Sequence, residues 1–344
     1  MTATWRGTLP QLSGRLFLTD GGIETSMIAL EGFELPEFAV FPLLTTEEGD
    51  AALRRYFRAY VEIARRWGAG LVLETATWRA SAGWGAKLGF SPRDLRDANR
   101  RAVRLLEEVR AESEREAAAG GDAAAAERAR AQVVISGCLG PLPVDDESRA
   151  RSAQVAGARD AAVACDAAEA YHRAQIETFA ASAADMIGAL TIDNAEEAVG
   201  IARAAEKAGM PVAISFTVET DGRLASGQPL RAAIEQVEAA TSAYPSYYML
   251  NCAHPSHFEG ALVEGGAWVE RIRGLRANAS RLSHAELDAL PAPDPGDPKE
   301  LGREYARLKR RLPQLNVFGG CCGTDHRHLE NIAAACAPLF AGGV

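Results

Sequence analysis

The sequence predicts an α/β fold, a (β/α)8 TIM barrel built as a single domain from residues 1–344, on three observations. Eight short apolar or β-branched runs recur along the chain, segments of helical character separate them, and the length exceeds the ~250 residues that such a barrel needs. The runs lack the strict apolar–polar alternation of a sheet with one face in water, which favours buried parallel strands. A closed barrel of parallel strands accounts for all three observations.

The predicted strands and helices alternate in chain order. The strands are LFLTD from residue 16, LVLETAT from 71, VVISGCL from 133, DMIGALT from 185, PVAISFTV from 211, YYMLNCA from 247, IRGLRANA from 272 and LNVFGG from 315. Residues 47–68, 195–209 and 297–312 have the composition of helices. We expect Gly68 and Gly209 to end two of them, because glycine adopts the left-handed backbone of a helix C-terminus without strain.

Three insertions exceed what a minimal barrel needs, around residues 110–132, 141–160 and 282–300. The first is rich in Ala, Glu and Arg, and we expect a solvated helical hairpin that turns at Gly120 and Gly121. The other two follow the third and seventh strands, on the side where barrels carry their active sites. Either of these two could therefore cover the site.

Composition and charge exclude several classes of protein. The 46 acidic against 37 basic residues give a net charge of -9, whereas nucleic-acid-binding surfaces usually carry a positive stripe. No apolar run approaches the ~18 residues of a membrane span, and the first residues lack the apolar middle of a signal peptide. We therefore expect a cytoplasmic protein with small-molecule partners and neither nucleic acid nor membrane as a partner, and the sequence leaves its oligomeric state open.

Polar and glycine-rich motifs follow the predicted strands at their carboxyl ends. They are DGGIET (20–25), TATWRAS (75–81), GCLGP (137–141), SFTVETDGRLASG (215–227), NCAHP (251–255), RANAS (276–280) and GGCCGT (319–324). The carboxyl ends of parallel barrel strands share one rim. The motifs therefore predict a single pocket at that rim.

Three cysteines in these motifs form a candidate metal site. Cys252 ends the sixth strand, and the adjacent Cys321 and Cys322 end the eighth. A disulfide between adjacent residues would strain the backbone, but inward-leaning side chains could bring three sulfurs to the ~2.3 Å bond length of zinc, helped by the flexible glycines at 319, 320 and 323. Three thiolates leave one position of a catalytic zinc open. From the residues alone, a redox-active cysteine pair and ordinary rim cysteines remain alternatives.

The other cysteines and the histidines are assigned structural roles. Cys165 and Cys336 lie in Ala-rich helical stretches and are expected in the core, whereas Cys138 could line the pocket. A histidine could supply a fourth ligand or a supporting hydrogen bond, the candidates being His254, His257, His326 and His328. We favour structural roles because Thr324 or Asp325 can cap a final helix whose first turn holds the last two histidines.

A three-thiolate zinc is suited to alkyl transfer. Zn²⁺ does no redox chemistry, and three thiolates make it a weak Lewis acid for splitting water. A substrate thiol in the fourth position would lose its proton, because coordination lowers its pKa, and would stay nucleophilic. The predicted chemistry is transfer of an alkyl group to sulfur.

The motifs DGG, TATWRAS, SFTVETDGRLASG, NCAHP, RANAS and GGCCGT resemble those of the homocysteine S-methyltransferases, zinc-dependent barrels that methylate a thiol from a sulfonium or betaine donor. The resemblance runs from about residue 16 to 336. It implies that Cys252, Cys321 and Cys322 bind Zn²⁺ and act in catalysis, in an enzyme of the EC 2.1.1 class. It also implies homocysteine as acceptor, methionine as product, and S-adenosylmethionine, S-methylmethionine or a betaine-like compound as donor.

The resemblance also implies contacts to the substrates. Asp20, with Gly21 and Gly22 behind it, is expected to help hold the amino-acid end of the thiol. Trp78 is expected to face a cationic donor through its ring, with Trp84 as second choice. The full set of expected substrate contacts is Asp20, Gly21, Gly22, Glu24, Thr75, Trp78, Thr191 and Asn251.

Three positions depart from the pattern of the family, and one of them is Trp78, where the family more often has tyrosine. Leu190-Thr191 stands where the family has Glu-Thr, so a carboxylate for the substrate ammonium is missing. Asp193, Glu24 or Glu219 could replace it, or the enzyme alkylates a different thiol or selenol. Arg79 replaces a polar amide and could bind a carboxylate. A non-catalytic barrel that binds zinc or a thiol is the third hypothesis.

Overall fold

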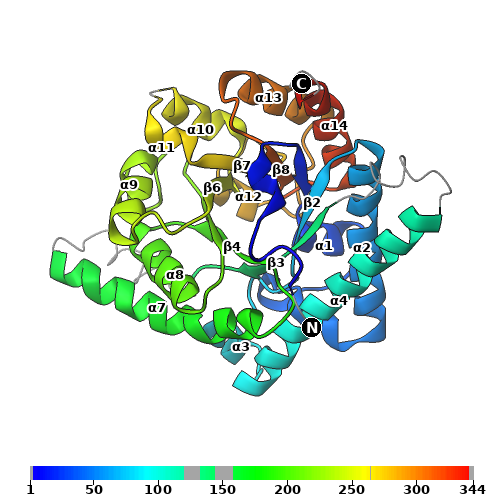
Figure 1. The fold of residues 1–344 in the computed structure, drawn as a ribbon, viewed down its shortest axis with the longest axis horizontal. Helices are drawn as coiled ribbons and strands as arrows, with labels where there is room; N and C mark the ends of the chain where they lie inside the picture. The colour runs from blue at the N-terminus through cyan, green and yellow to red at the C-terminus, as the bar shows by residue number, and fades with distance from the viewer. Residues whose placement is uncertain (1–2, 120–131, 144–157, 264, 341–344) are drawn as a thin grey trace.

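The computed structural model describes residues 3–119, 132–143, 158–263 and 265–340, and its eight parallel strands close into one barrel (Figure 1). The strands are β1 (Phe17–Thr19), β2 (Gly70–Glu74), β3 (Val133–Leu139), β4 (Met186–Ile192), β5 (Val212–Phe216), β6 (Tyr247–Asn251), β7 (Ile272–Ala277) and β8 (Val317–Gly320). Each strand pairs with the next along the chain, and β8 pairs with β1. The predicted (β/α)8 fold is confirmed, with a strand at each of the expected runs.

Helices surround the barrel and cover the outer faces of the strands (Figure 1). They are α1 (Ile23–Ala29), α2 (Glu47–Arg66), α3 (Ala82–Lys87), α4 (Pro92–Ala119), α7 (Ala158–Ala180), α8 (Ala195–Lys207), α9 (Leu230–Ala240), α10 (Pro255–Leu262), α11 (Ala267–Glu270), α12 (His284–Asp288), α13 (Pro298–Arg311) and α14 (His326–Cys336). Short 3-10 turns occur at Pro10–Ser13, Pro36–Phe38, Phe41–Thr45 and Ala337–Phe340. None of the described helices is long and apolar enough to cross a membrane.

Local sequence fixes where the main helices begin and end. The side chains of Thr46 and Asn194 accept hydrogen bonds from the backbone N–H groups of Gly49 and Glu197, which caps α2 and α8. After these helices, Gly68 and Gly209 have φ values of 61° and 65°. Both predicted helix ends are therefore confirmed, because glycine takes this left-handed conformation without a Cβ clash.

The structure describes different parts of the three predicted insertions. The first begins within α4, which continues to Ala119, but the expected turn at Gly120 and Gly121 lies outside the described residues. Residues 144–157 of the second also lie outside them, and α7 begins at Ala158. The third contains α12 and a loop that reaches the β8 end, where the backbone carbonyl of Pro295 accepts a hydrogen bond from the His328 ring.

The interior of the barrel changes from apolar to polar along the strands. Near their amino ends an apolar cluster fills it, formed by Leu9, Phe17, Val72, Val134, Met186, Ala213, Tyr247, Met249 and Val317. Side chains two residues apart on a strand share a face. Two residues further on, that face carries Thr19, Glu74, Ser136, Gly188, Ser215, Asn251 and Gly319. The barrel therefore has a packed apolar base and a polar layer beneath the carboxyl-end rim.

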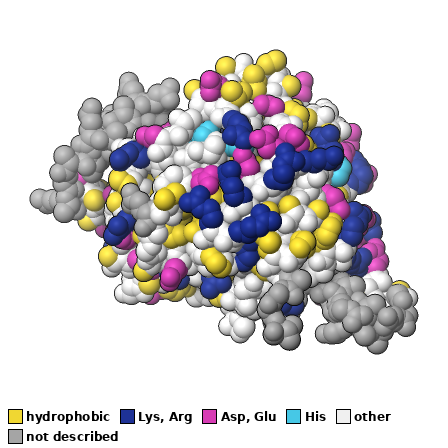
Figure 2. All heavy atoms as spheres, turned by 90° about the horizontal axis from the view of Figure 1, so that it is seen from above, with side chains coloured by type: hydrophobic (Ala, Val, Ile, Leu, Met, Phe, Trp, Pro, Cys, Tyr) yellow, Lys and Arg dark blue, Asp and Glu magenta, His cyan; other side chains and the backbone are white. Residues whose placement is uncertain are grey.

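Charged side chains of both signs are interspersed over the face of the molecule seen in Figure 2. Lysine and arginine side chains are numerous across the middle of that face, and aspartates and glutamates lie among them. Many are paired, as in the ion pairs from Arg307 and Arg311 to Glu259. Such exposed pairs contribute little to stability and mainly keep the surface polar.

Candidate metal centre and substrate pocket

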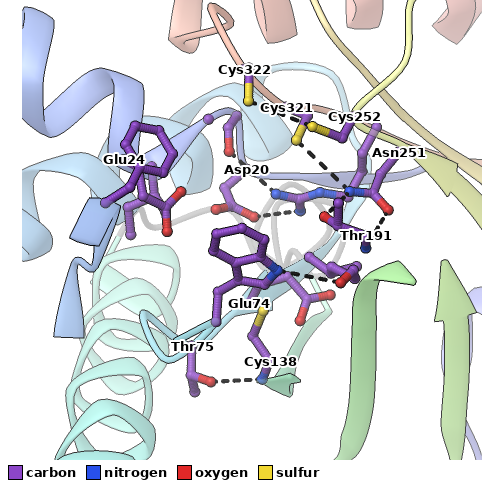
Figure 3. A pocket seen from close by; sticks show the side chains of 17 residues that line it. Asp20, Glu24, Glu74, Thr75, Cys138, Thr191, Asn251, Cys252, Cys321 and Cys322 are labelled. Carbon is purple, nitrogen blue, oxygen red and sulfur yellow. Dashed lines mark hydrogen bonds and ion pairs between the residues drawn. The ribbon is translucent and has the colours of Figure 1, made fainter. Parts of the chain in front are cut away.

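Three sulfur atoms converge at the carboxyl ends of β6 and β8 (Figure 3). The Sγ atoms of Cys252, Cys321 and Cys322 all lie within 4.8 Å of one another, and those of Cys252 and Cys322 are 3.7 Å apart. They form the single group of three or more potential ligands found among the described residues. β7 separates the two strands, and the predicted convergence across it is confirmed.

Asn278 joins the two halves of the cysteine cluster. Its side-chain amide donates to the carbonyl of Cys252 at 3.0 Å and its Oδ1 accepts from the N–H of Cys322 at 3.1 Å. Cys252 itself has a φ of 56°, which is uncommon for a residue with a Cβ. The RANAS motif thus has a structural function, since its asparagine holds a strained cysteine and a second cysteine in register.

The glycines around the cysteine pair serve in two ways. Gly323 has a φ of 77°, a left-handed conformation that only glycine adopts easily, so it bends the backbone after Cys322. Gly319 and Gly320 instead allow close packing, because a Cβ at either position would clash with the side chain of Thr19 or Thr324.

The environment makes Cys321 the first of the three thiols to ionise. The neighbouring Cys252 and Cys322 thiols hydrogen-bond to its sulfur, and the Arg276 guanidinium attracts the thiolate, so that the pKa of Cys321 is lowered well below its usual value. The Asn251 amide also lies 3.9 Å from this sulfur. A cationic metal favours thiolates in the same way, so the cluster is poised to lose protons on metal binding.

The pocket beside the sulfurs contains every residue expected to contact substrate. It is lined by Asp20, Gly21, Gly22, Ile23, Glu24, Phe38, Glu74, Thr75, Trp78, Cys138, Leu190, Thr191, Asn251, Arg276 and the three clustered cysteines. Asp193 and Glu219, named as replacements for the missing carboxylate, do not line it, whereas Glu24 does. Cys138 lines the pocket outside the three-sulfur group, and burial raises the pKa of its thiol well above the usual value.

Asp20 is engaged in a buried ion pair that sequence analysis did not foresee. Its Oδ1 accepts a hydrogen bond from Arg276 Nη1 at 2.7 Å, and its Oδ2 accepts one from the Tyr56 hydroxyl at 3.0 Å. The side chains of Asp20 and Arg276 are 1% and 5% exposed. The position of Arg276, at the end of a buried strand within RANAS, was the sequence signal for this pair.

Glu74 is a second charged residue that sequence analysis missed. It ends β2 and lies across the pocket from the cysteines in the view of Figure 3. Burial raises its pKa to about 7, although the attraction of Arg276 opposes this. A carboxylate at the last position of a buried strand was its sequence signal.

This raised pKa predicts a pH dependence of stability. Between pH 4.5, the ordinary pKa, and about 7, folded Glu74 keeps a proton that the unfolded chain has lost. The free energy of unfolding should therefore fall as pH rises through this window, by up to about 3 kcal/mol. The free energy of unfolding is measured in urea at pH 5 and at pH 8. Its decrease between these two pH values should be larger in wild type than in the Glu74→Gln variant by this amount. Identical pH dependences of the two proteins would contradict the prediction.

Asn251 holds the loop after β4 in an unusual conformation. Thr191 has a φ of 63°, which is rare for a β-branched residue. Asn251 Oδ1 accepts from the Thr191 N–H at 2.8 Å, and its amide donates to the Thr191 hydroxyl at 2.8 Å. Asn251 precedes Cys252, so it links the metal centre to the pocket wall formed by Leu190 and Thr191.

The aromatic residues at the pocket are arranged differently from expectation. The Arg79 guanidinium lies 3.9 Å from the ring centre of Trp84 and 4.8 Å from that of Trp78. Trp84, the second choice for contacting a cationic donor, does not line the pocket, whereas Trp78 does. The Trp78 indole N–H donates to the Leu190 carbonyl, which orients its ring.

The histidines have the structural roles favoured by sequence analysis. His254 caps α10, and burial lowers its pKa to about 4. Asp325 caps α14, whose first turn contains His326 and His328. His284 of α12 donates a ring N–H to the carbonyl of Cys252, so the third insertion contacts the cysteine cluster directly.

Comparisons with known proteins show the family to which this chain is similar. The model of the family described as homocysteine S-methyltransferase matches residues 17–336. The methionine synthase of Mycobacterium leprae is 32% identical over 42% of this chain and 12% of its own length. The betaine–homocysteine S-methyltransferase 1 of Rattus norvegicus is 27% identical over 49% of this chain and 43% of its own. The chain thus spans less than half the length of these curated relatives.

Solved structures show the same fold. The homocysteine methyltransferase MmuM of Escherichia coli superposes in its oxidized form with a TM-score of 0.69 and 19% identity, over 95% of this chain and 98% of MmuM. Its metallated form gives a TM-score of 0.67, again at 19% identity, over 93% and 96%. Because the family model covers almost the whole barrel, with the three-cysteine cluster inside the matched residues, the chain belongs to the homocysteine S-methyltransferase family.

Proposed function

We propose that the protein is a zinc-dependent S-methyltransferase that moves a methyl group from a sulfonium or ammonium donor to a small thiol, with homocysteine as acceptor and methionine as product. The observation that carries the proposal is the cluster of Cys252, Cys321 and Cys322, whose sulfurs face the pocket and one another. S-adenosylmethionine, S-methylmethionine and betaine-like compounds are the candidate donors.

The spacing of the sulfurs fits zinc. Two thiolates on a tetrahedral zinc, with bonds of about 2.3 Å, lie about 3.8 Å apart. The distance of 3.7 Å between the Cys252 and Cys322 sulfurs matches this value. When bound there, Zn²⁺ lowers the pKa of a substrate thiol so that the thiolate is the nucleophile. Three protein ligands leave one position open toward the pocket.

The pocket residues would position the two substrates and exclude water. Ile23, Phe38 and Leu190 present apolar side chains beside the cysteines, which favours a desolvated and more reactive thiolate. Trp78 offers an aromatic face to the cationic donor. The acceptor thiolate attacks the methyl carbon in line and forms a new sulfur–carbon bond. The bond between the methyl group and the sulfur or nitrogen of the donor breaks at the same time, and the donor leaves without its positive charge. No general base beyond solvent is needed.

The test of this function is product detection by mass spectrometry. The zinc-loaded protein is incubated with homocysteine and each donor in turn, and we expect methionine with at least one of them. Treatment with a chelator should remove the activity, and added zinc should restore it. Absence of any methylated product with homocysteine and with a panel of other thiols would contradict the proposal and favour a barrel that only binds zinc or thiols.

Leu190 favours a second candidate within the same chemistry. It lines the pocket where the sequence resemblance leads us to expect a glutamate. An acceptor with a different thiol, or a selenol, could then be preferred. Competition between homocysteine and such acceptors in one reaction decides this, because a strong preference for homocysteine excludes the second candidate.

A further inference from the structure

The pocket leaves open how the positive end of an amino-acid acceptor is bound. An ammonium group that leaves water needs a carboxylate or comparable acceptors in its place. Leu190 offers none, and both oxygens of Asp20 already accept hydrogen bonds from Arg276 and Tyr56. Asp20 is therefore largely neutralised by the protein itself.

Glu24 and Glu74 are the other carboxylates that line this pocket among the described residues. Glu24 lies in the first turn of α1 and is half-buried, and burial raises its pKa to about 7, although the charge of Arg79 partly opposes this. Glu74 is 5% exposed, and its Oε2 has no partner in good hydrogen-bonding geometry among the described residues, the Ser136 hydroxyl being the neighbouring donor. A buried carboxylate oxygen without a partner is costly, which points to a ligand that completes it.

The neighbouring strands leave space for the Glu74 carboxylate, and the Arg276 guanidinium hydrogen-bonds to groups other than Glu74. A Cβ at Gly188 of β4 would lie 2.5 Å from Glu74 Oε2 and 2.7 Å from Oε1, so glycine at this position makes room for the carboxylate. The Arg276 guanidinium hydrogen-bonds to Asp20, Thr19 and the Gly21 carbonyl. Its charge attracts Glu74 without a hydrogen bond that would fill the Oε2 position.

We propose that Glu74 is the specificity-determining carboxylate of this pocket, and that it binds the ammonium group of an amino-thiol acceptor in place of the glutamate replaced by Leu190. This inference rests on the proposed function. Glu74 lies across the pocket from the three sulfurs, so one acceptor can present its thiol to the cysteines and its ammonium to Glu74 (Figure 3). Gly188 makes room for the Glu74 carboxylate, and the ion pair with Asp20 keeps the Arg276 guanidinium from filling the ammonium position.

The first experiment compares two acceptors in Glu74→Gln. Glutamine keeps the size of the side chain but loses its charge, and a charged hydrogen bond of this kind corresponds to roughly 30-fold in affinity. We expect KM for homocysteine to rise roughly 30-fold, while KM for 4-sulfanylbutanoate, which is homocysteine without its amino group, stays within about twofold. Zinc content, measured by atomic absorption, should be unchanged. Glu259→Gln, outside the pocket, is the matched control and should leave both KM values near those of wild type.

The second experiment does not depend on turnover. Methionine carries the same ammonium group and no ionisable thiol, so calorimetry with methionine measures this contact by itself. We expect Glu74→Gln to weaken methionine binding roughly 30-fold and Glu259→Gln to leave it unchanged. Equal binding by wild type and Glu74→Gln, or a loss confined to Glu24→Gln, would overturn the inference even if the wild-type enzyme methylates homocysteine. Wild type that turns over no thiol would instead remove the proposed function.

Discussion

Replacing Cys322 with alanine is expected to abolish zinc binding and methyl transfer together. The variant keeps two sulfurs, and each thiolate ligand of a structural or catalytic zinc supplies about 3 kcal/mol of binding free energy, or roughly 100-fold in affinity. The remaining Cys252 and Cys321 would hold zinc weakly and with a different geometry. Zinc content by atomic absorption and methionine formation by mass spectrometry measure the two effects on one sample.

Cys165→Ala is the matched control for this variant. Cys165 is a buried cysteine on α7, outside the three-sulfur cluster, and its replacement removes a thiol without touching the pocket. We expect wild-type zinc content and activity from it. Full activity in a metal-free Cys322→Ala protein would show that the sulfur cluster is not the catalytic centre.

Replacing Arg276 with methionine is expected to cause the largest loss of stability. Asp20 would remain buried at 1% exposure without its counter-charge, and breaking a buried pair in this way costs about 3–5 kcal/mol. The hydrogen bonds to Thr19 and the Gly21 carbonyl would be lost as well. The free energy of unfolding, measured in urea at pH 7 with zinc in equal excess, should fall by this amount.

The double variant Asp20→Asn with Arg276→Met separates the charge from the packing. Removing both charges leaves no uncompensated ion, so we expect the double variant to be more stable than Arg276→Met alone. The Tyr56 hydroxyl can still donate to the asparagine oxygen. The single variant Asp20→Asn is measured as well. If the losses in free energy of unfolding of the two single variants add up to that of the double variant, the charges of the pair do not stabilise the pocket floor.

The barrel and the cysteine cluster at its rim could be predicted because their signals are local in the sequence. Each strand is a short apolar run, and α2 and α8 each carry their own cap and terminal glycine, such as Thr46 and Gly68 around α2. Parallel strands direct their carboxyl ends to one rim, so motifs such as NCAHP and GGCCGT had to meet there. All eight expected substrate contacts accordingly line the pocket, although their roles in binding remain predictions.

The charged floor of the pocket could not be predicted in the same way. Glu74 and Arg276 stand within strands where most residues are apolar, and the sequence does not tell which charges will face each other across a barrel. The guanidinium of Arg79 also lies against Trp84, so a ring that sequence analysis assigned to a cationic ligand already contacts a cation of the protein. These contacts depend on distances between side chains that are far apart in the sequence.

The sequence by itself determined the barrel, the rim that carries the pocket and the three cysteines that converge there, because periodicity, strand direction and residue type are properties of short segments. The tertiary structure alone decided that Arg276 neutralises Asp20, that Gly188 makes room for Glu74, and that Asn278 joins Cys252 to Cys322. These features arise from the register of neighbouring strands around a closed barrel, and a shift of one residue in that register would turn each side chain to the other face.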